Sequence, residues 1–263
     1  MDKVDFQVIV TIGPSSMDEG TIKRIDACGP CIFRINGAYI DVNKVKALRD
    51  RIISFVPDAK ILLDFPSDKK WFLARNKKLK TQFLTAKDKA LIKKVCHIGI
   101  DYLGMSHVLN VDNISEVKKL ISKQNEGHPE LICKIETTSA LMNLESILHE
   151  VSYILVDRGD LAKEIGTNEL PKQQEIIINQ AKLHSVNVIL ATNFLKTMET
   201  EHLPSIPEAI DLYKTIQDEV AGVQMSEETA IGMFPVKCVE YVFNLYKIYK
   251  RTLGVAWNPM KKK

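Results

Sequence analysis

The chain has 263 residues, of which 45% are hydrophobic and 26% charged, and its formal net charge at pH 7 is only +3. A nearly neutral chain gives no electrostatic basis for binding nucleic acid, and no apolar run approaches the roughly 18 residues that a membrane span needs. The N-terminal residues do not resemble a signal peptide, and five cysteines are not an even disulfide set. We therefore expect a cytoplasmic globular protein that acts on a small molecule.

Eight short runs rich in Val, Ile, Leu and Phe recur along the chain, and each ends in polar or small residues. They cover residues 7–14, 31–37, 60–66, 102–108, 131–137, 153–160, 187–193 and 222–229. Runs of this kind suit parallel strands buried on both faces, and amphipathic stretches with helical spacing lie between them. The alternation predicts an α/β fold, a single TIM (β/α)8 barrel with parallel strands. An open doubly wound sheet is the alternative, although the first run ends in TIGPSS and not in a glycine-rich phosphate loop.

The second run begins at a Cys-Gly-Pro-Cys sequence, Cys28 to Cys31, which has the spacing of thioredoxin-like oxidoreductases. In those folds the first cysteine begins a helix, whose dipole lowers the pKa of the thiol. Here a helical stretch precedes the motif and an apolar run follows it. Gly29 and Pro30 therefore indicate a helix end and a strand start, and a turn is favoured over a redox site.

A basic segment, residues 67–84, lies between the third run and the next helical stretch. Trp71, Phe72 and Leu73 are interleaved with its charges. The basic residues are Lys69, Lys70, Arg75, Lys77, Lys78 and Lys80. The segment is either a solvated hairpin with an apolar anchor or a loop at the barrel mouth that attracts an anionic ligand.

Polar and charged side chains stand at the ends of the predicted strands. The loops after the strands of a β/α barrel build its active site, so these side chains would converge on one rim. Such a convergence favours a functional site over isolated ion pairs. The residues are Ser15, Ser16, Arg34, Asn36, Asp64, Ser106, His107, Lys134, Glu136, Asp157, Arg158, Asp160, Thr192, Asn193, Ser226, Glu227 and Glu228.

Lys134 and Glu136 are two residues apart in one predicted strand, so both side chains face the barrel interior. Asp160 ends the neighbouring run, and two carboxylates there suit a small hard cation such as Mg²⁺. Desolvation and like charge would disfavour the ammonium form of a buried lysine beside that cation, so we expect Lys134 to exchange protons near neutral pH. The alternative is an ion pair of Lys134 with Glu136 or Asp160, without a metal.

Other rim groups suit an anionic substrate. Arg34 offers paired donors to a carboxylate or phosphate, and Thr192 and the backbone of residues 158–160 would donate to a carboxylate. These groups, a metal and a lysine together suit a 2-oxo acid or its enol phosphate. The metal would stabilise an enolate and the lysine would move the proton.

The motifs of the chain resemble, in the same order, the barrel domain of the pyruvate kinase family, from residue 8 to about residue 240. They are TIGPSS, FRIN, LLD, ICKIET, VDRGDLAKEIG, ATNFLKTM and MSEETAIGMFP. The resemblance implies that Lys134 protonates the enolate, that Arg34 contacts the transferring phosphoryl group and that Thr192 lies close to the proton path. It also implies that Glu136 and Asp160 ligate Mg²⁺ or Mn²⁺. The substrate-binding residues would be Arg34, Ser106, Gly159, Asp160 and Thr192.

The chain departs from the family in the parts that face the nucleotide. Residues 1–263 are expected to be the barrel alone, with the basic segment in place of the family's lid domain and without its C-terminal domain. Asn36 and Asp64 fall where the family binds a monovalent cation. Ala38 and Tyr39 replace the family's potassium-binding serine and nucleotide-side histidine, so a need for K⁺ stays open. The family's interface segment PTRAE is PSIPE here, which leaves homo-oligomer formation open as well.

Three functions fit this combination. The first is Mg²⁺-dependent phosphoryl transfer of the pyruvate kinase type, acting on phosphoenolpyruvate or pyruvate with weak or altered nucleotide use. The second is an aldolase or lyase that forms a pyruvate enolate and needs no nucleotide. The third is a non-catalytic paralogue that binds an oxo acid.

Overall fold

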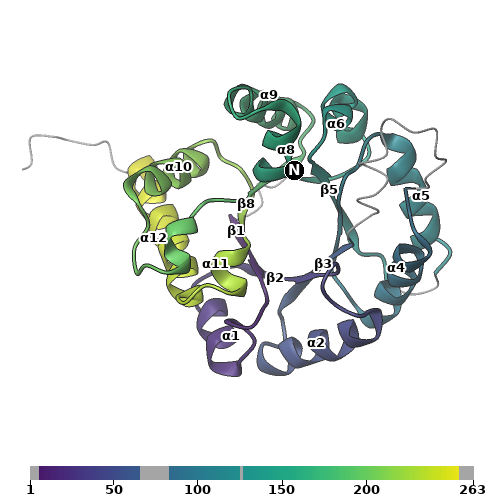
Figure 1. Cartoon of the computed structure of the whole chain (residues 1–263), viewed down its shortest axis with the longest axis horizontal. Helices are drawn as coiled ribbons and strands as arrows, with labels where there is room; N and C mark the ends of the chain where they lie inside the picture. The colour runs from purple at the N-terminus through teal and green to yellow at the C-terminus, as the bar shows by residue number, and fades with distance from the viewer. Residues whose placement is uncertain (1–5, 66–82, 125–126, 255–263) are drawn as a thin grey trace, which may run out of the picture.

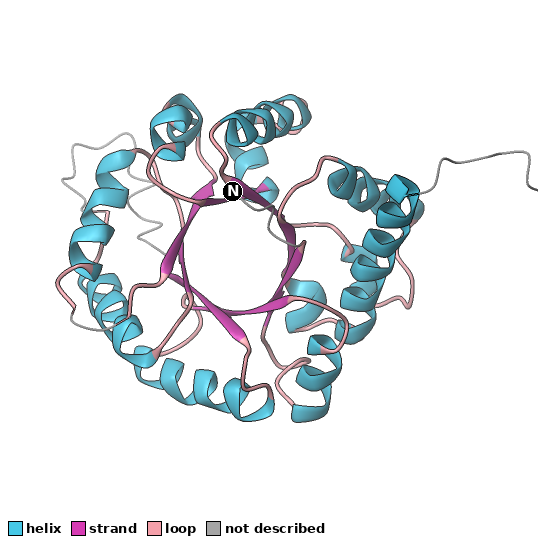
Figure 2. Cartoon of the chain, turned by 180° about the vertical axis from the view of Figure 1, so that it is seen from behind, coloured by secondary structure: helices cyan, strands magenta, loops and turns pink. Residues whose placement is uncertain are grey.

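The computed structural model describes residues 6–65, 83–124 and 127–254, which form a closed ring of strands enclosed by helices (Figure 1). The strands are all parallel and follow one another in chain order, and β8 closes the barrel on β1. The helices lie outside the ring in the opposite view too (Figure 2). The predicted α/β barrel is confirmed, and the open-sheet alternative is wrong.

Each predicted run overlaps one strand, and β5 begins one residue before its run. The strands are β1 (Gln7–Thr11), β2 (Cys31–Asn36), β3 (Lys60–Phe65), β4 (Tyr102–Met105), β5 (Glu130–Ile135), β6 (Tyr153–Asp157), β7 (Asn187–Ala191) and β8 (Gly222–Met225). Strand β3 reaches the last described residue of its run. The other strands end before their runs do, because the polar or small residues at the end of each run belong to the following loop or helix.

The helices of the described residues alternate with the strands. They are α1 (Glu19–Asp26), α2 (Val42–Phe55), α4 (Ala86–Ile98), α5 (Val111–Ile121), α6 (Thr138–Met142), α7 (Leu144–Leu148), α8 (Arg158–Ile165), α9 (Leu170–Leu183), the short 3-10 helix η1 (Lys196–Glu199), α10 (Ile206–Gln217), α11 (Glu227–Ala230) and α12 (Pro235–Gly254). None of these helices is both long and apolar enough to cross a membrane.

The strands carry two apolar cores because successive side chains point to opposite faces. The outward core lies between strands and helices. The inward core, which fills the lower part of the barrel, consists of Ile9, Ile32, Leu62, Ile132, Tyr153, Leu155, Ile189 and Ala191. The next inward position along four of these strands is charged: Arg34, Asp64, Lys134 and Asp157. The charged groups therefore form a layer next to the inward apolar core, at the carboxyl ends of the strands.

The Cys28 and Cys31 thiols belong to a turn, as the order of elements predicted. Helix α1 ends at Asp26, and Cys31 opens β2. A Cβ at Gly29 would lie 2.7 Å from the Phe243 ring, so the close packing of this turn requires glycine. Burial raises the pKa of Cys28 to about 11, which is the opposite of what a reactive thiol needs.

Most of the basic segment lies outside the described residues. Its lysines and arginine therefore have no structural description, and both interpretations of the segment stay open. Its last two residues, Phe83 and Leu84, are buried in the outward core.

Candidate functional site

A cavity of about 250 Å³ opens where the strands end. The structure brings all nine predicted site residues to its walls: Arg34, Asn36, Asp64, Ser106, Lys134, Glu136, Gly159, Asp160 and Thr192. Asp157, His107 and Gln224 also line it. The charged layer of the strands, together with the first turn of α8, therefore encloses one space.

The Lys134 ammonium lies among carboxylates in the wall of this cavity. Its Nζ is 2.6 Å from Glu136 Oε1 and 3.5 Å from Asp157 Oδ2. The Lys134 side chain is 7% exposed and that of Glu136 is 1% exposed. Lys134 is the last-but-one residue of β5 and Glu136 is the first residue after it, so the strand geometry sets this pair.

The loop after β4 holds the second oxygen of Glu136. The backbone N–H of His107 donates to Oε2 at 2.7 Å, and Nδ1 of the same histidine lies 3.0 Å from that oxygen. His107 reaches this position with φ of 52°, in the left-handed region that few non-glycine residues adopt. Burial alone would raise the pKa of Glu136, but Lys134 and His107 hold it well below the ordinary value of a glutamate.

The carboxylates around Lys134 shift its pKa in the direction opposite to the one expected beside a bound cation, so titration near neutral pH stays a prediction for the cation-bound site. Burial lowers the pKa of Lys134, but attraction by Glu136, Asp64 and Asp157 outweighs burial and raises the pKa above the ordinary lysine value. The expected direction rested on desolvation and a cation alone, whereas three carboxylates surround the amine. These carboxylates therefore favour the protonated form of Lys134.

Three carboxylates form a group that can hold a hard cation. One oxygen from each of Glu136, Asp157 and Asp160 lies within 4.8 Å of the other two. Asp160 Oδ1 also accepts from the exposed Lys163 ammonium at 2.7 Å. Carboxylate oxygens in this number, with room for water and substrate oxygens, fit the octahedral preference of Mg²⁺. Asp157 was named at a strand end but not as a ligand, although it precedes Asp160 by only three residues.

Arg34 and Asp64 contact each other across strands β2 and β3. The Nε and Nη2 atoms of Arg34 lie 2.7 Å and 2.6 Å from Asp64 Oδ2, and Nη1 donates to the Thr11 hydroxyl at 2.9 Å. Asp64 Oδ1 is buried and accepts no hydrogen bond from a described residue. Arg34 was expected to contact the substrate and Asp64 a cation, and their pairing with each other was not predicted from the sequence.

The Thr192 backbone has an unusual conformation that its neighbours maintain. Its φ is 80°, which is rare for a β-branched residue and typical of strain stored at functional positions. The Thr192 hydroxyl donates to Asp157 Oδ1 at 2.7 Å, and the Arg158 guanidinium donates to the Thr192 carbonyl. Arg158 also pairs with Asp211 and covers the Phe194 ring. Arg158 therefore supports the loop and does not line the cavity.

Asn36 and Ser106 occupy the remaining predicted positions. Asn36 lies opposite Asp64 in the register of β2 and β3, and its Oδ1 accepts from the Ala38 N–H. Ser106 is buried at the end of β4. Gln224 was not predicted as a site residue, and its buried amide oxygen has no hydrogen-bond partner among the described residues.

Comparisons with known proteins point to one family. A family model described as the pyruvate kinase barrel domain matches residues 65–239. The chain is 34% identical over 181 residues to a pyruvate kinase of Thermococcus litoralis, a match that covers 68% of this chain and 38% of that protein. It is 30% identical over 213 residues to a pyruvate kinase of Geobacillus stearothermophilus, covering 81% of this chain and 35% of that protein. The matches thus span less than half the length of each relative.

Proposed function

This chain belongs to the pyruvate kinase family, and from that premise we propose that it acts on phosphoenolpyruvate or pyruvate through an enolate. The reaction is phosphoryl transfer of the pyruvate kinase type, in which nucleotide use is weak or altered. Tyr39 replaces the family's nucleotide-side histidine and Ala38 its potassium-binding serine, while the residues that would face the enol acid are present.

One observation carries this proposal: the buried Lys134 ammonium, 2.6 Å from Glu136, opens onto the cavity that Asp157 and Asp160 also line. Burying such charges adds little to stability by itself, since desolvation offsets much of the attraction. An amine held in its protonated form can deliver a proton to a carbanion-like carbon. The arrangement therefore suits an enolate better than it suits a purely structural ion pair.

Glu136 and Asp160, with Asp157 beside them, would hold Mg²⁺ or Mn²⁺. When bound, such a cation would draw negative charge from the oxygens of the enol acid. Lys134 and Lys163 each pair with one of these carboxylates, so both pairs would loosen as the ligands turn toward the ion.

The protein side chains would then neutralise the developing charges and donate the proton. The bond between phosphorus and the enol oxygen breaks, and the phosphoryl group passes to an acceptor oxygen. The remaining enolate takes a proton from Lys134 Nζ at its methylene carbon, which gives pyruvate. Arg34 neutralises charge on the phosphoryl oxygens, and its pairing with Asp64 fixes the plane of the guanidinium.

The substrate carboxylate would lie over the first turn of α8. N–H groups in a first turn have no partner within the helix, and the helix dipole favours an anion there. Gly159 leaves room, since a Cβ at that position would lie 2.8 Å from Thr192 Cγ2. Thr192 and Ser106 flank this space. A monovalent cation near Asn36 would use Asp64 Oδ1 and would share Asp64 with Arg34.

Two measurements test the proposal. The first is consumption of phosphoenolpyruvate with Mg²⁺ and ADP, other nucleotides or a panel of further acceptors. The second is exchange of the pyruvate methyl protons with D₂O, followed by NMR. We expect Lys134→Met to slow both by about a hundredfold or more, which is the usual contribution of a general acid or base. Lys118→Met is the matched control, because Lys118 is also ion-paired, with Glu150, but does not line the cavity.

The two readouts separate the alternatives. Proton exchange without phosphoryl transfer to any acceptor would contradict the kinase reaction and favour an aldolase or lyase. Binding of oxalate with Mg²⁺, without either reaction, would favour a non-catalytic oxo-acid sensor. Equal activity of Lys134→Met and the wild type would remove the proposed role of Lys134.

A further inference from the structure

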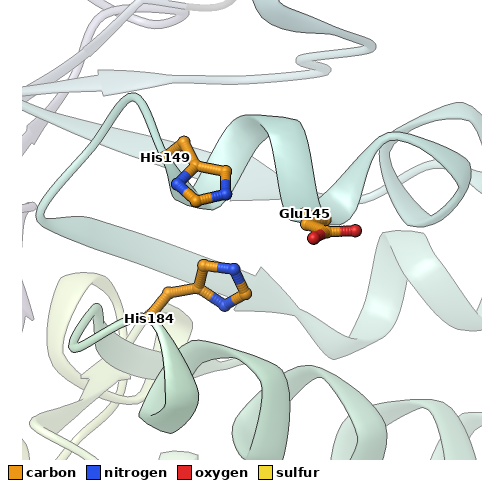
Figure 3. A group of neighbouring side chains, drawn as sticks. All are labelled: Glu145, His149 and His184. Carbon is orange, nitrogen blue, oxygen red and sulfur yellow. The ribbon is translucent and has the colours of Figure 1, made fainter.

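A second group of metal-binding side chains lies at the other end of the barrel. Glu145 is in α7, His149 directly follows that helix, and His184 directly follows α9 (Figure 3). His149 precedes β6 and His184 precedes β7, so both histidines lie at the amino ends of the strands. The carboxylate cluster of the cavity is at their carboxyl ends. Glu145, His149 and His184 therefore have no part in the reaction proposed above.

The three side chains converge from two helices that are far apart in the sequence. One ligand atom of each lies within 4.8 Å of the other two. The two imidazole rings form a T-shaped pair, with centroids 4.8 Å apart and planes at 85°. Ligand atoms of a tetrahedral zinc ion are about 3.3 Å apart, given bonds of about 2.0 to 2.1 Å. Glu145 and His149 are exposed and His184 is half-buried, so small side-chain rotations suffice to close this difference.

The hydrogen bonding of His184 prepares it to bind a metal. Its Nδ1 lies 2.9 Å from the carbonyl oxygen of Gln180. A carbonyl can only accept, so Nδ1 carries the proton and Nε2 keeps a free lone pair. A ligating histidine typically has its other ring nitrogen bonded to a carbonyl or carboxylate, which fixes the tautomer and the ring direction.

Glu145 and His149 are four residues apart, and residues with this spacing are neighbours on the surface of a helix. The Glu145 carboxylate has no hydrogen-bond or ion-pair partner among the residues that the structure describes. The neighbouring Glu150, in contrast, is paired with Lys118. Glu145 is therefore available to a cation at the same place where two imidazoles converge.

We propose that Glu145, His149 and His184 bind one transition-metal dication of the zinc type, with water completing the coordination. Two imidazoles and one carboxylate suit Zn²⁺, whereas the all-carboxylate cavity suits Mg²⁺. The ion connects the end of α7 to the end of α9 on the face of the barrel that serves stability. Its effect is to stabilise the fold.

The test is a calorimetric titration of the metal-free full chain with Zn²⁺ in excess Mg²⁺, which competes for the carboxylates of Glu136, Asp157 and Asp160. We expect one saturable zinc site per chain. His149→Ala and His184→Ala should each weaken it by about tenfold or more, and Glu145→Gln by less. His202→Ala and Cys28→Ser are controls with unchanged affinity, because His202 packs on Phe234 and Cys28 lies beside α1.

Thermal unfolding supplies a second readout. Zinc should raise the melting temperature of the wild type in proportion to the logarithm of its concentration, and it should not do so for either histidine variant. His184→Gln removes the ligand with a smaller change of polarity, should the alanine variant unfold. The absence of saturable zinc binding by the folded wild type would overturn the proposal. Undiminished affinity in both His149→Ala and His184→Gln would overturn it too.

Discussion

Lys134 Nζ lies 2.6 Å from Glu136 Oε1, and the two side chains are 7% and 1% exposed. The pair comes from positions i and i+2 at the end of β5. Glu136 is the nearest countercharge of Lys134, and Asp157 follows at 3.5 Å. Any change at Glu136 therefore affects both the charge balance of the amine and the proposed cation site.

Glu136→Gln should reduce the free energy of unfolding by about 3–5 kcal/mol, since it leaves a buried ammonium without its closest partner. It should also lower the affinity for Mg²⁺, because one of three carboxylates is lost. Denaturant titration in a chelator measures the first effect, and a Mg²⁺ titration of the folded variant measures the second.

The double variant Lys134→Met with Glu136→Gln supplies the control. Removing the unpaired ammonium should recover part of the lost stability, so the two changes should not be additive. Additive losses would show that the pair is not coupled. Unchanged Mg²⁺ affinity in Glu136→Gln would exclude this carboxylate as a ligand.

The strands could be predicted from the sequence because buried parallel strands consist of short apolar runs. The spacing of Lys134 and Glu136 likewise places them on one face without any tertiary information. The pairing of Arg34 with Asp64 could not be predicted from the sequence, because it depends on the register between β2 and β3. The pKa of Lys134 is raised by Glu136 and further by Asp64 and Asp157, which come from two other strands. Contacts between charged residues of different strands cannot be predicted from each strand separately.

Gly104 of β4 makes room for the Asp64 carboxylate. A Cβ at Gly104 would lie 1.8 Å from Asp64 Oδ1 and 2.9 Å from Asp64 Cγ. Gly104→Ala should therefore displace Asp64, break its contact with Arg34 and cost about 1–3 kcal/mol of stability, which is the usual range for overpacking. Calorimetric or denaturant unfolding would measure the loss. Gly20→Ala in α1 is the matched control, with its nearest atom 3.3 Å away, and an equal loss there would contradict the explanation.

Gly159→Ala should weaken substrate binding while it preserves the fold. The added Cβ would lie 2.8 Å from Thr192 Cγ2, so the side chain of Thr192 must move. We expect the affinity for oxalate in the presence of Mg²⁺ to fall by about tenfold to a hundredfold, as small misplacements in a site commonly do. The melting temperature should change little, since alanine is favoured over glycine inside a helix. Full oxalate affinity in a folded Gly159→Ala would exclude this position from the carboxylate site.

Glu228 in α11 gives a prediction for the dependence of stability on pH. Burial raises its pKa above the ordinary glutamate value, and the nearby Glu227 and Glu199 add to the increase, although the Ser226 N–H donates to its Oε2 at 2.8 Å. The folded state then binds the proton more tightly than the unfolded state. Stability should therefore fall as the pH rises from the unfolded pKa to the folded pKa, and it should stay lower above that window.

Glu228→Gln replaces the carboxylate by a neutral group that can still accept from Ser226. The variant should unfold at a higher temperature than the wild type at pH 7 to 8, and the difference should shrink below the ordinary pKa of glutamate. Unfolding curves across pH measure both points. Glu240→Gln, at an exposed position of α12, should show no such pH-dependent difference. If Glu228→Gln is less stable than the wild type at neutral pH, then the Ser226 contact needs the full negative charge, and burial is not the dominant influence on Glu228.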